Sequence, residues 1–135
     1  MKKRLIIALP LALSVAGTIA LAEDTRTERV EFRKGATSAH LEGTIVGYET
    51  VDYMLRAAAG QTMKVEVTTN NRFLYFNVID TTTDEALFVG SSEAEPNTWS
   101  GELASDGDYT IRVYLMRNEA RRDGKAHYSV DISIS

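Results

Sequence analysis

The sequence predicts an all-β protein with one domain, a single-domain antiparallel β-sandwich of about eight to nine strands. Short segments of alternating apolar and polar residues recur along the chain, with turn signals about every 8–12 residues. Beyond the first 22 residues, no stretch has the apolar spacing of an amphipathic helix. Residues 23–135 are enough for one domain with a core that needs no disulfides.

The N-terminus has the pattern of a secretory signal peptide. Three basic residues at positions 2–4 precede the apolar run Leu5–Leu21, which overlaps an A-x-A cleavage pattern at Ala20–Ala22. The alternative is a retained membrane anchor, for which the apolar run is short. We therefore expect residues 1–22 to be removed, leaving residues 23–135 as the exported β-sandwich domain.

Four strands are expected in the first half of the exported chain. Glu23–Glu28 is polar and is expected to be a loose leader. The segments that follow alternate apolar and polar residues and are separated by turns that contain glycine. These predicted strands are Arg29–Lys34, Ser38–Val46, Val51–Leu55 and Met63–Thr68.

The middle of the chain is expected to supply a core strand and two short strands. Phe73–Ile79 is rich in apolar residues and does not alternate, so we expect both of its faces to be covered. Ala86–Val89 and Trp99–Leu103 are the short strands. Loops rich in Thr, Ser and Gly separate the three segments.

Two long alternating strands end the chain and are expected to form a hairpin, Asp108–Met116 with Lys125–Ile134. The connection Arg117–Gly124 is longer than the two to five residues of most hairpins. The connection contains three arginines, and a rigid sheet would hold both of its ends. A functional role explains such a loop, because binding residues are often carried on loops of rigid scaffolds.

The charge distribution sets this connection apart from the rest of the protein. Without the signal peptide, 12 basic residues face 19 acidic ones, a net charge of −7. The window Arg117–Lys125 carries +2, which leaves −9 on the remainder. An acidic surface argues against nucleic acid and anionic membranes as partners. The alternative is that the charged loop only keeps a sheet edge soluble.

No residue pattern supplies catalysis, a cofactor or a metal site. Cysteine is absent, which excludes thiolate nucleophiles and zinc–thiolate sites. His40 and His127 lie out of phase with the apolar residues of their strands, so we expect both to face solvent. No G-x-S-x-G or H-E-x-x-H motif is present. Asp106–Asp108 could ligate calcium, but Asp and Gly at the start of a strand usually form an ordinary turn, which is what we expect here. We expect a protein that is not an enzyme.

Tyr48 is the aromatic residue that packing explains least. It lies in a corner between two strands, where a ring has little to bury against. An exposed tyrosine near arginines is typical of protein interfaces; the alternative is a ring that folds back onto the sheet. The other aromatic residues lie in or near strands, and most are expected to pack in the core.

Several segments resemble one protein family and together span nearly the whole exported chain. They are Val30–Gly35, Ser38-Ala39, Gly43, Gly47-Tyr48, Tyr53, Ala59–Gln61, Gly107–Tyr109, Arg112-Val113 and Arg117–Arg121. With these residues the chain resembles the periplasmic inhibitors of g-type lysozyme from Gram-negative bacteria. The Arg-Asn-x-Ala-Arg segment is the most specific of them.

The resemblance implies a periplasmic β-sandwich that blocks the substrate cleft of a g-type (goose-type) lysozyme and needs no cofactor. The family inhibits through loop arginines and a tyrosine, which match Arg117, Arg121 and Tyr48. Asn118 and Arg122 complete the candidate partner-binding set because they lie in the same connection. The inhibitor role requires Tyr48 and this connection to share one end of the sandwich, which the sequence leaves open, as it does the oligomeric state.

Two other functions are compatible with the sequence. One is a non-catalytic envelope binding module, similar to pre-peptidase C-terminal β-sandwiches or to carbohydrate-binding domains, with Trp99 and Tyr114 as candidate platforms for a glycan. The other is a purely structural envelope protein in which the charged connection only maintains solubility.

Overall fold

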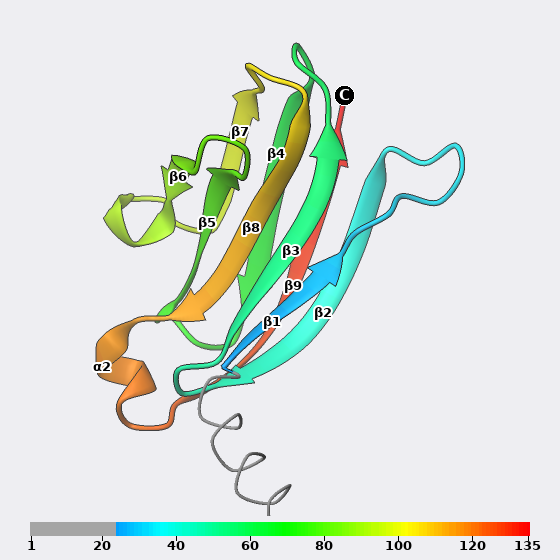
Figure 1. Cartoon of the computed structure of the whole chain (residues 1–135). Coiled ribbons are helices and arrows are strands. Elements are labelled where there is room, and N and C mark those ends of the chain that lie inside the picture. Colours follow the sequence, from blue (N-terminus) through cyan, green and yellow to red (C-terminus); the bar gives the residue numbers. More distant parts are fainter. Residues whose placement is uncertain (1–23) are drawn as a thin grey trace, which may run out of the picture.

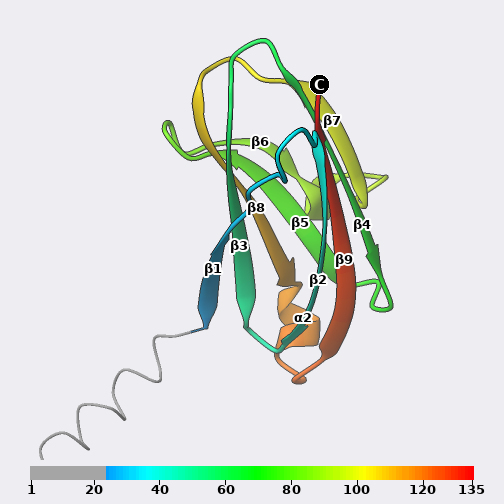
Figure 2. The same ribbon diagram turned by 90° about the vertical axis from the view of Figure 1, so that its right-hand side faces the viewer.

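Two β-sheets pack face to face in the computed structural model, which describes residues 24–135 (Figures 1 and 2). One sheet has the strand order β1-β3-β8-β5-β6, and the other has the order β2-β9-β4-β7. The strands are β1 (Thr25–Arg29), β2 (Ser38–Val46), β3 (Thr50–Ala57), β4 (Thr62–Thr69), β5 (Leu74–Asp80), β6 (Glu85–Val89), β7 (Thr98–Glu102), β8 (Gly107–Leu115) and β9 (Lys125–Ile134). Two short helices, η1 (Gly90–Ser92) and α2 (Arg117–Ala120), lie between strands. The predicted all-β sandwich is confirmed.

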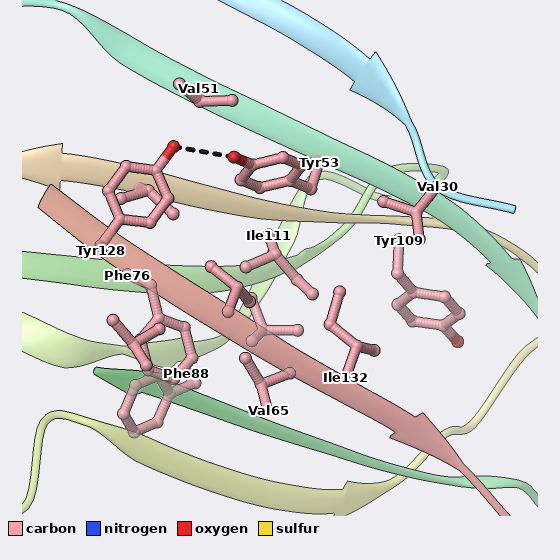
Figure 3. Packing of buried hydrophobic residues seen from close by; sticks show 14 of the residues in the cluster. Val30, Val51, Tyr53, Val65, Phe76, Phe88, Tyr109, Ile111, Tyr128 and Ile132 are labelled. Carbon is pink, nitrogen blue, oxygen red and sulfur yellow. Dashed lines mark hydrogen bonds between the residues drawn. The ribbon is translucent and has the colours of Figure 1, made fainter. Parts of the chain in front are cut away.

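The core lies between the sheets and consists of every second residue of their strands. Ile45 of β2 and Phe76 of β5 are examples of side chains with no exposed surface. Tyr53 of β3 and Tyr128 of β9 meet across the two sheets with their hydroxyl oxygens 2.8 Å apart (Figure 3). Burial raises the pKa of both phenols. The hydrogen bond gives each buried hydroxyl a partner, so neither is left unsatisfied in the core.

The two last strands do not form the predicted hairpin, although their bounds are close to those expected. β8 pairs with β3 and β5 in the five-stranded sheet, whereas β9 pairs with β2 and β4 in the four-stranded sheet. The connection between them therefore crosses from one sheet to the other. This crossing explains its length, because the faces of packed sheets lie about 10 Å apart, twice the spacing of paired strands.

The first strand also differs from the prediction. β1 lies in the segment expected to be a leader, and it pairs in parallel with the edge of β3. The predicted strand Arg29–Lys34 is instead an irregular segment that turns at Gly35, where φ is 82°. Val30 and Phe32 nevertheless face the core, as expected. Arg29 fixes this edge, since its guanidinium donates to both carboxylate oxygens of Asp108 at 2.8 and 3.0 Å.

β5 is an interior strand, but it is not covered equally on both faces. Leu74, Phe76 and Val78 are buried in the core, while the alternate residues Tyr75 and Ile79 are only half-buried. The outer face of the five-stranded sheet is thus open at β5. The lack of alternation in the sequence arises because apolar side chains also occupy that outer face.

The remaining expectations concern the termini and the polar residues. The predicted signal peptide, residues 1–22, lies outside the described residues. No helix within residues 24–135 is long and apolar enough to cross a membrane. His40 and His127 are exposed, as expected. Asp106 acts as a turn residue, since its carboxylate accepts the backbone N–H of Ala59 at 2.8 Å.

Candidate functional site

The connection between β8 and β9 is folded rather than open. α2 forms its first half, where the carbonyl of Met116 accepts the backbone N–H groups of Glu119 and Ala120 at 3.0 and 2.9 Å. Ala120 is 1% exposed and belongs to the core cluster, which fixes the inner side of the helix. Asp123 then takes a left-handed conformation, with φ 57°, and the chain enters β9. The connection therefore presents its outer residues from a defined backbone.

Glu119 fastens this connection to the turn between β4 and β5. Its nearly buried carboxylate accepts the side-chain amide of Asn71 at 2.7 Å and the guanidinium of Arg122 at 2.7 Å. Asn71 is itself held, because its Oδ1 accepts the backbone N–H of Phe73. The Asn71 amide, and after it the Arg122 guanidinium, holds the pKa of Glu119 below its usual range.

The anchoring roles of Asn71 and Glu119 are not identifiable from the sequence. Asn71 stands out there only as a turn residue, and Glu119 only as one acid among three arginines. A carboxylate enclosed by basic residues is the one signal that points to an internal ion pair. It does not show which arginine forms the pair.

The candidate residues of the connection fall into two groups. Arg122 is bound to Glu119. Arg117, Asn118 and Arg121 are exposed, and within residues 24–135 neither Arg117 nor Arg121 forms a side-chain hydrogen bond or an ion pair. Two guanidinium groups are thus available to a partner, and the third stabilises the connection.

The corner that carries Tyr48 lies directly beside this connection, between β2 and β3 at the same end of the sandwich (Figures 1 and 2). The backbone N–H of Gly47 donates to the carbonyl of Gly124 at 2.8 Å, which ties the two segments together. Gly47 has a φ of 63°, a conformation that glycine adopts without strain. Tyr48 is 55% exposed, and it lines the same open hollow of about 650 Å³ as Arg117.

The sequence has a curated relative that decides the family. The chain is 33% identical over 107 residues to the inhibitor of g-type lysozyme from Escherichia coli (strain K12), covering 78% of each protein. The chain belongs to this family. No family model matches the sequence. Proteins of this family are inhibitors rather than enzymes, which agrees with the absence of catalytic motifs in the sequence.

Solved structures of the lysozyme inhibitor family have the same fold. The periplasmic inhibitor of g-type lysozyme from Aeromonas hydrophila superimposes with a TM-score of 0.74 at 37% identity, covering 82% of this chain and 97% of that one. The corresponding protein of Salmonella Typhimurium gives a TM-score of 0.63 at 29% identity, with 82% and 98% covered. The pre-peptidase C-terminal domain of a Bacillus anthracis collagenase, at 14% identity and a TM-score of 0.55, shares the fold alone.

In this inhibitor-family protein, side chains on the outer face of the five-stranded sheet line the hollow beside Tyr48. Arg112 of β8 forms a two-point ion pair with Asp52 of β3, at 2.8 and 2.9 Å. Tyr114 of β8 donates its hydroxyl to Oδ1 of Asn77 at 3.0 Å. Leu115 and Met116 complete the apolar part of the lining. These polar contacts fix the walls, and Arg117 lies at the edge of the hollow with no carboxylate partner in the described part of the chain.

The aromatic residues considered for glycan binding have other contacts. Trp99 packs against the core cluster, with its ring 6.4 Å from that of Phe88, and it covers Gly101 of its own strand. Tyr114 faces the hollow rather than forming a flat platform. A carbohydrate-binding surface built on Trp99 therefore has no support from the packing.

Proposed function

We propose that this protein is a periplasmic inhibitor of g-type lysozyme and that it closes the enzyme's glycan cleft with the β8–β9 connection and the Tyr48 corner. Family membership supports the partner and the compartment. The observation that supports the site is the hydrogen bond from Gly47 to Gly124, because it brings Tyr48 beside Arg117 although the two are far apart in the sequence.

The arginines of this protein and the cleft of a lysozyme have complementary chemistry. Glycoside hydrolases work with carboxylates that line the cleft on either side of the scissile bond. Arg117 and Arg121 offer planar, permanently charged donors that form charge-assisted hydrogen bonds with carboxylates in the cleft and at its rim. Once the cleft is filled, these bonds are shielded from water, and the glycan has no room to bind.

The connection is suited to insertion because its backbone is already ordered. Two contacts hold it: the hydrogen bond between the Asn71 amide and the Glu119 carboxylate, and the burial of Ala120 in the core. Binding then immobilises few groups beyond the exposed arginine and tyrosine side chains, which lowers the entropic cost of association. We assign Arg122 to this support, through Glu119, and Asn118 to the exposed face that meets the enzyme.

The first test replaces Arg117 and Arg121, the two exposed arginines of the connection besides Arg122. The mature protein is expected to slow the lysis of peptidoglycan by a g-type lysozyme. Arg117→Ala with Arg121→Ala is expected to weaken inhibition by roughly 100-fold or more, since paired arginines are frequent hot spots of interfaces. Thermal unfolding should change little, because neither side chain has a protein partner within the described part of the chain.

The matched control removes the same charge elsewhere. Arg33→Ala with Arg56→Ala alters two exposed arginines away from the connection and should leave inhibition intact. Full inhibition by the Arg117 and Arg121 double variant would overturn the site. Failure of the unaltered protein to inhibit any g-type enzyme at micromolar concentration would overturn the function.

A further inference from the structure

Exposed apolar surface is concentrated at the end of the sandwich that carries Tyr48. Among residues 24–135, the exposed large hydrophobic side chains are Val46 and Tyr48, which flank the same corner. The hollow next to this corner adds Tyr114, Leu115 and Met116. Tyr48 itself lines the hollow with these side chains, and apolar surface gathered in this way marks a site of interaction.

The hollow is formed before any partner binds. The hydroxyl of Tyr114 is fixed on Asn77, whose Oδ1 also accepts the backbone N–H of Gly90 at 3.3 Å. The ring of Tyr114 packs on Tyr75 with 6.3 Å between the ring centroids. Two residues earlier on β8, Arg112 is fixed by its ion pair with Asp52. At about 650 Å³ the hollow is within the range of sites that enclose a small ligand or a few side chains.

The charges around the hollow define what it accepts. The charge of Arg112 is compensated by Asp52, so it attracts an anion only weakly. Glu49 and Arg117 line the same hollow. The Glu49 carboxylate accepts the backbone N–H of Val46 at 2.8 Å, whereas Arg117 has no carboxylate partner within residues 24–135, so an anionic group is favoured on the Arg117 side. An occupant therefore has to combine an apolar group, which fits against Tyr114 and Met116, with a carboxylate that reaches Arg117.

We propose that this hollow is a second recognition site, which receives an apolar side chain and an adjacent carboxylate from the lysozyme surface beside its cleft. The inference rests on the proposed function. In this arrangement Arg121 extends into the cleft, while Tyr114 and Met116 contact the rim of the enzyme. Carboxylates in the cleft are common to glycosidases, so contacts to the rim are what distinguishes one g-type lysozyme from another.

The experiment measures affinity for two g-type lysozymes from different animals by titration calorimetry. Tyr114→Ala and Met116→Ala are each expected to weaken binding by roughly 10-fold, the size of a good interface contact, and by different factors for the two enzymes. Met54→Ala is the matched control for Met116→Ala. It removes a half-buried methionine from the outer face of β3, outside the hollow, and should change affinity less than about twofold.

A charged variant provides the answer if Tyr114→Ala fails to fold. Met116→Glu places a carboxylate inside the hollow, next to Arg117. This carboxylate competes with the carboxylate of the partner for the guanidinium of Arg117. It is expected to weaken binding more than Met116→Ala, with unfolding still cooperative. Unchanged affinity in Met116→Ala and Met116→Glu would overturn the second site and leave the proposed function standing. Absence of binding by the unaltered protein would overturn both.

Discussion

The three arginines of the β8–β9 connection differ in what their guanidinium groups contact. Arg122 lies three residues after Glu119, where a helical turn brings the two side chains together. Arg117 and Arg121 lie four residues apart, on the solvent side of the same turn. The sequence alone identifies all three as candidates, because the choice depends on the direction in which the short helix presents each residue.

Glu119→Gln tests the internal ion pair through its pH dependence. The folded pKa of Glu119 is lowered by Asn71 and Arg122, so its contribution to stability is complete above the unfolded value of about 4.3. That contribution is lost as the pH falls through the lower, folded pKa. Glu119→Gln should therefore lower the unfolding temperature at pH 7, and the difference from the unaltered protein should shrink below about pH 4.

Glu102→Gln is the control for this measurement. It removes the same charge from an exposed position of β7, away from the connection. Its unfolding temperature should stay close to that of the unaltered protein at both pH values. A deficit of equal size at neutral and acid pH in Glu119→Gln would show that the carboxylate charge is not what holds the connection.

At the scale of strands, alternation predicts which residues are buried more reliably than which strands pair. The bounds of β2, β8 and β9 follow from their patterns almost to the residue. The assignment of β8 and β9 to different sheets cannot be predicted from these patterns. Alternation with a period of two shows which face of a strand is buried, but not which strand it pairs with. A hairpin and a crossing between two sheets leave the same pattern in the sequence.

β1 could not be predicted for a different reason. Its five residues, Thr25–Arg29, include no apolar side chain, and most of them are exposed. The strand is held by backbone hydrogen bonds to β3 and by the ion pair between Arg29 and Asp108. Neither contact has a local signature, since Asp108 lies far along the chain.

Shortening the β8–β9 connection distinguishes a crossing between sheets from a hairpin. Replacement of residues 117–124 by Asn-Gly would suit a hairpin, whose paired strands lie about 4.8 Å apart. Between Met116 and Lys125 it reaches about 10 Å only when fully extended, which leaves no chain for the change of direction between two packed sheets. We therefore expect loss of the cooperative unfolding transition seen by circular dichroism. A replacement by eight Gly and Ser residues keeps the span and should fold with a lower unfolding temperature. A stable protein with the two-residue turn would contradict the observed topology.

At the scale of the whole molecule, the candidate site is assembled from segments that the chain separates widely. The Tyr48 corner, the Asn71 turn and the β8–β9 connection meet at one end because the strands they join run side by side in two packed sheets. The sequence alone identifies candidate binding residues in the Tyr48 corner and in the β8–β9 connection. Their proximity, and the hollow between Tyr48 and Arg117, depend on the packing of the sheets.

The distribution of charge over the molecule predicts how binding responds to salt. Without its first 22 residues the protein carries −7, whereas the window Arg117–Lys125 carries +2. In the proposed complex, the acidic body would attract a basic lysozyme from a distance, and the arginines would bind only after contact. Raising the ionic strength from about 50 to about 500 mM shortens the range of the body's field to a few ångströms. The association rate with a basic g-type lysozyme should then fall by roughly tenfold, with a smaller change in the dissociation rate.

Two exposed glutamates on the four-stranded sheet separate this long-range attraction from the contact itself. Glu66→Gln with Glu102→Gln lowers the negative charge by two at positions remote from Tyr48 and the connection. This variant should associate more slowly at low salt and show a weaker dependence on salt, while its dissociation rate stays unchanged because no contact is lost. An association rate that ignores salt, or a salt effect confined to dissociation, would mean that the acidic body has no part in capture. Inhibition would then depend on the local contacts of the arginines and the hollow alone.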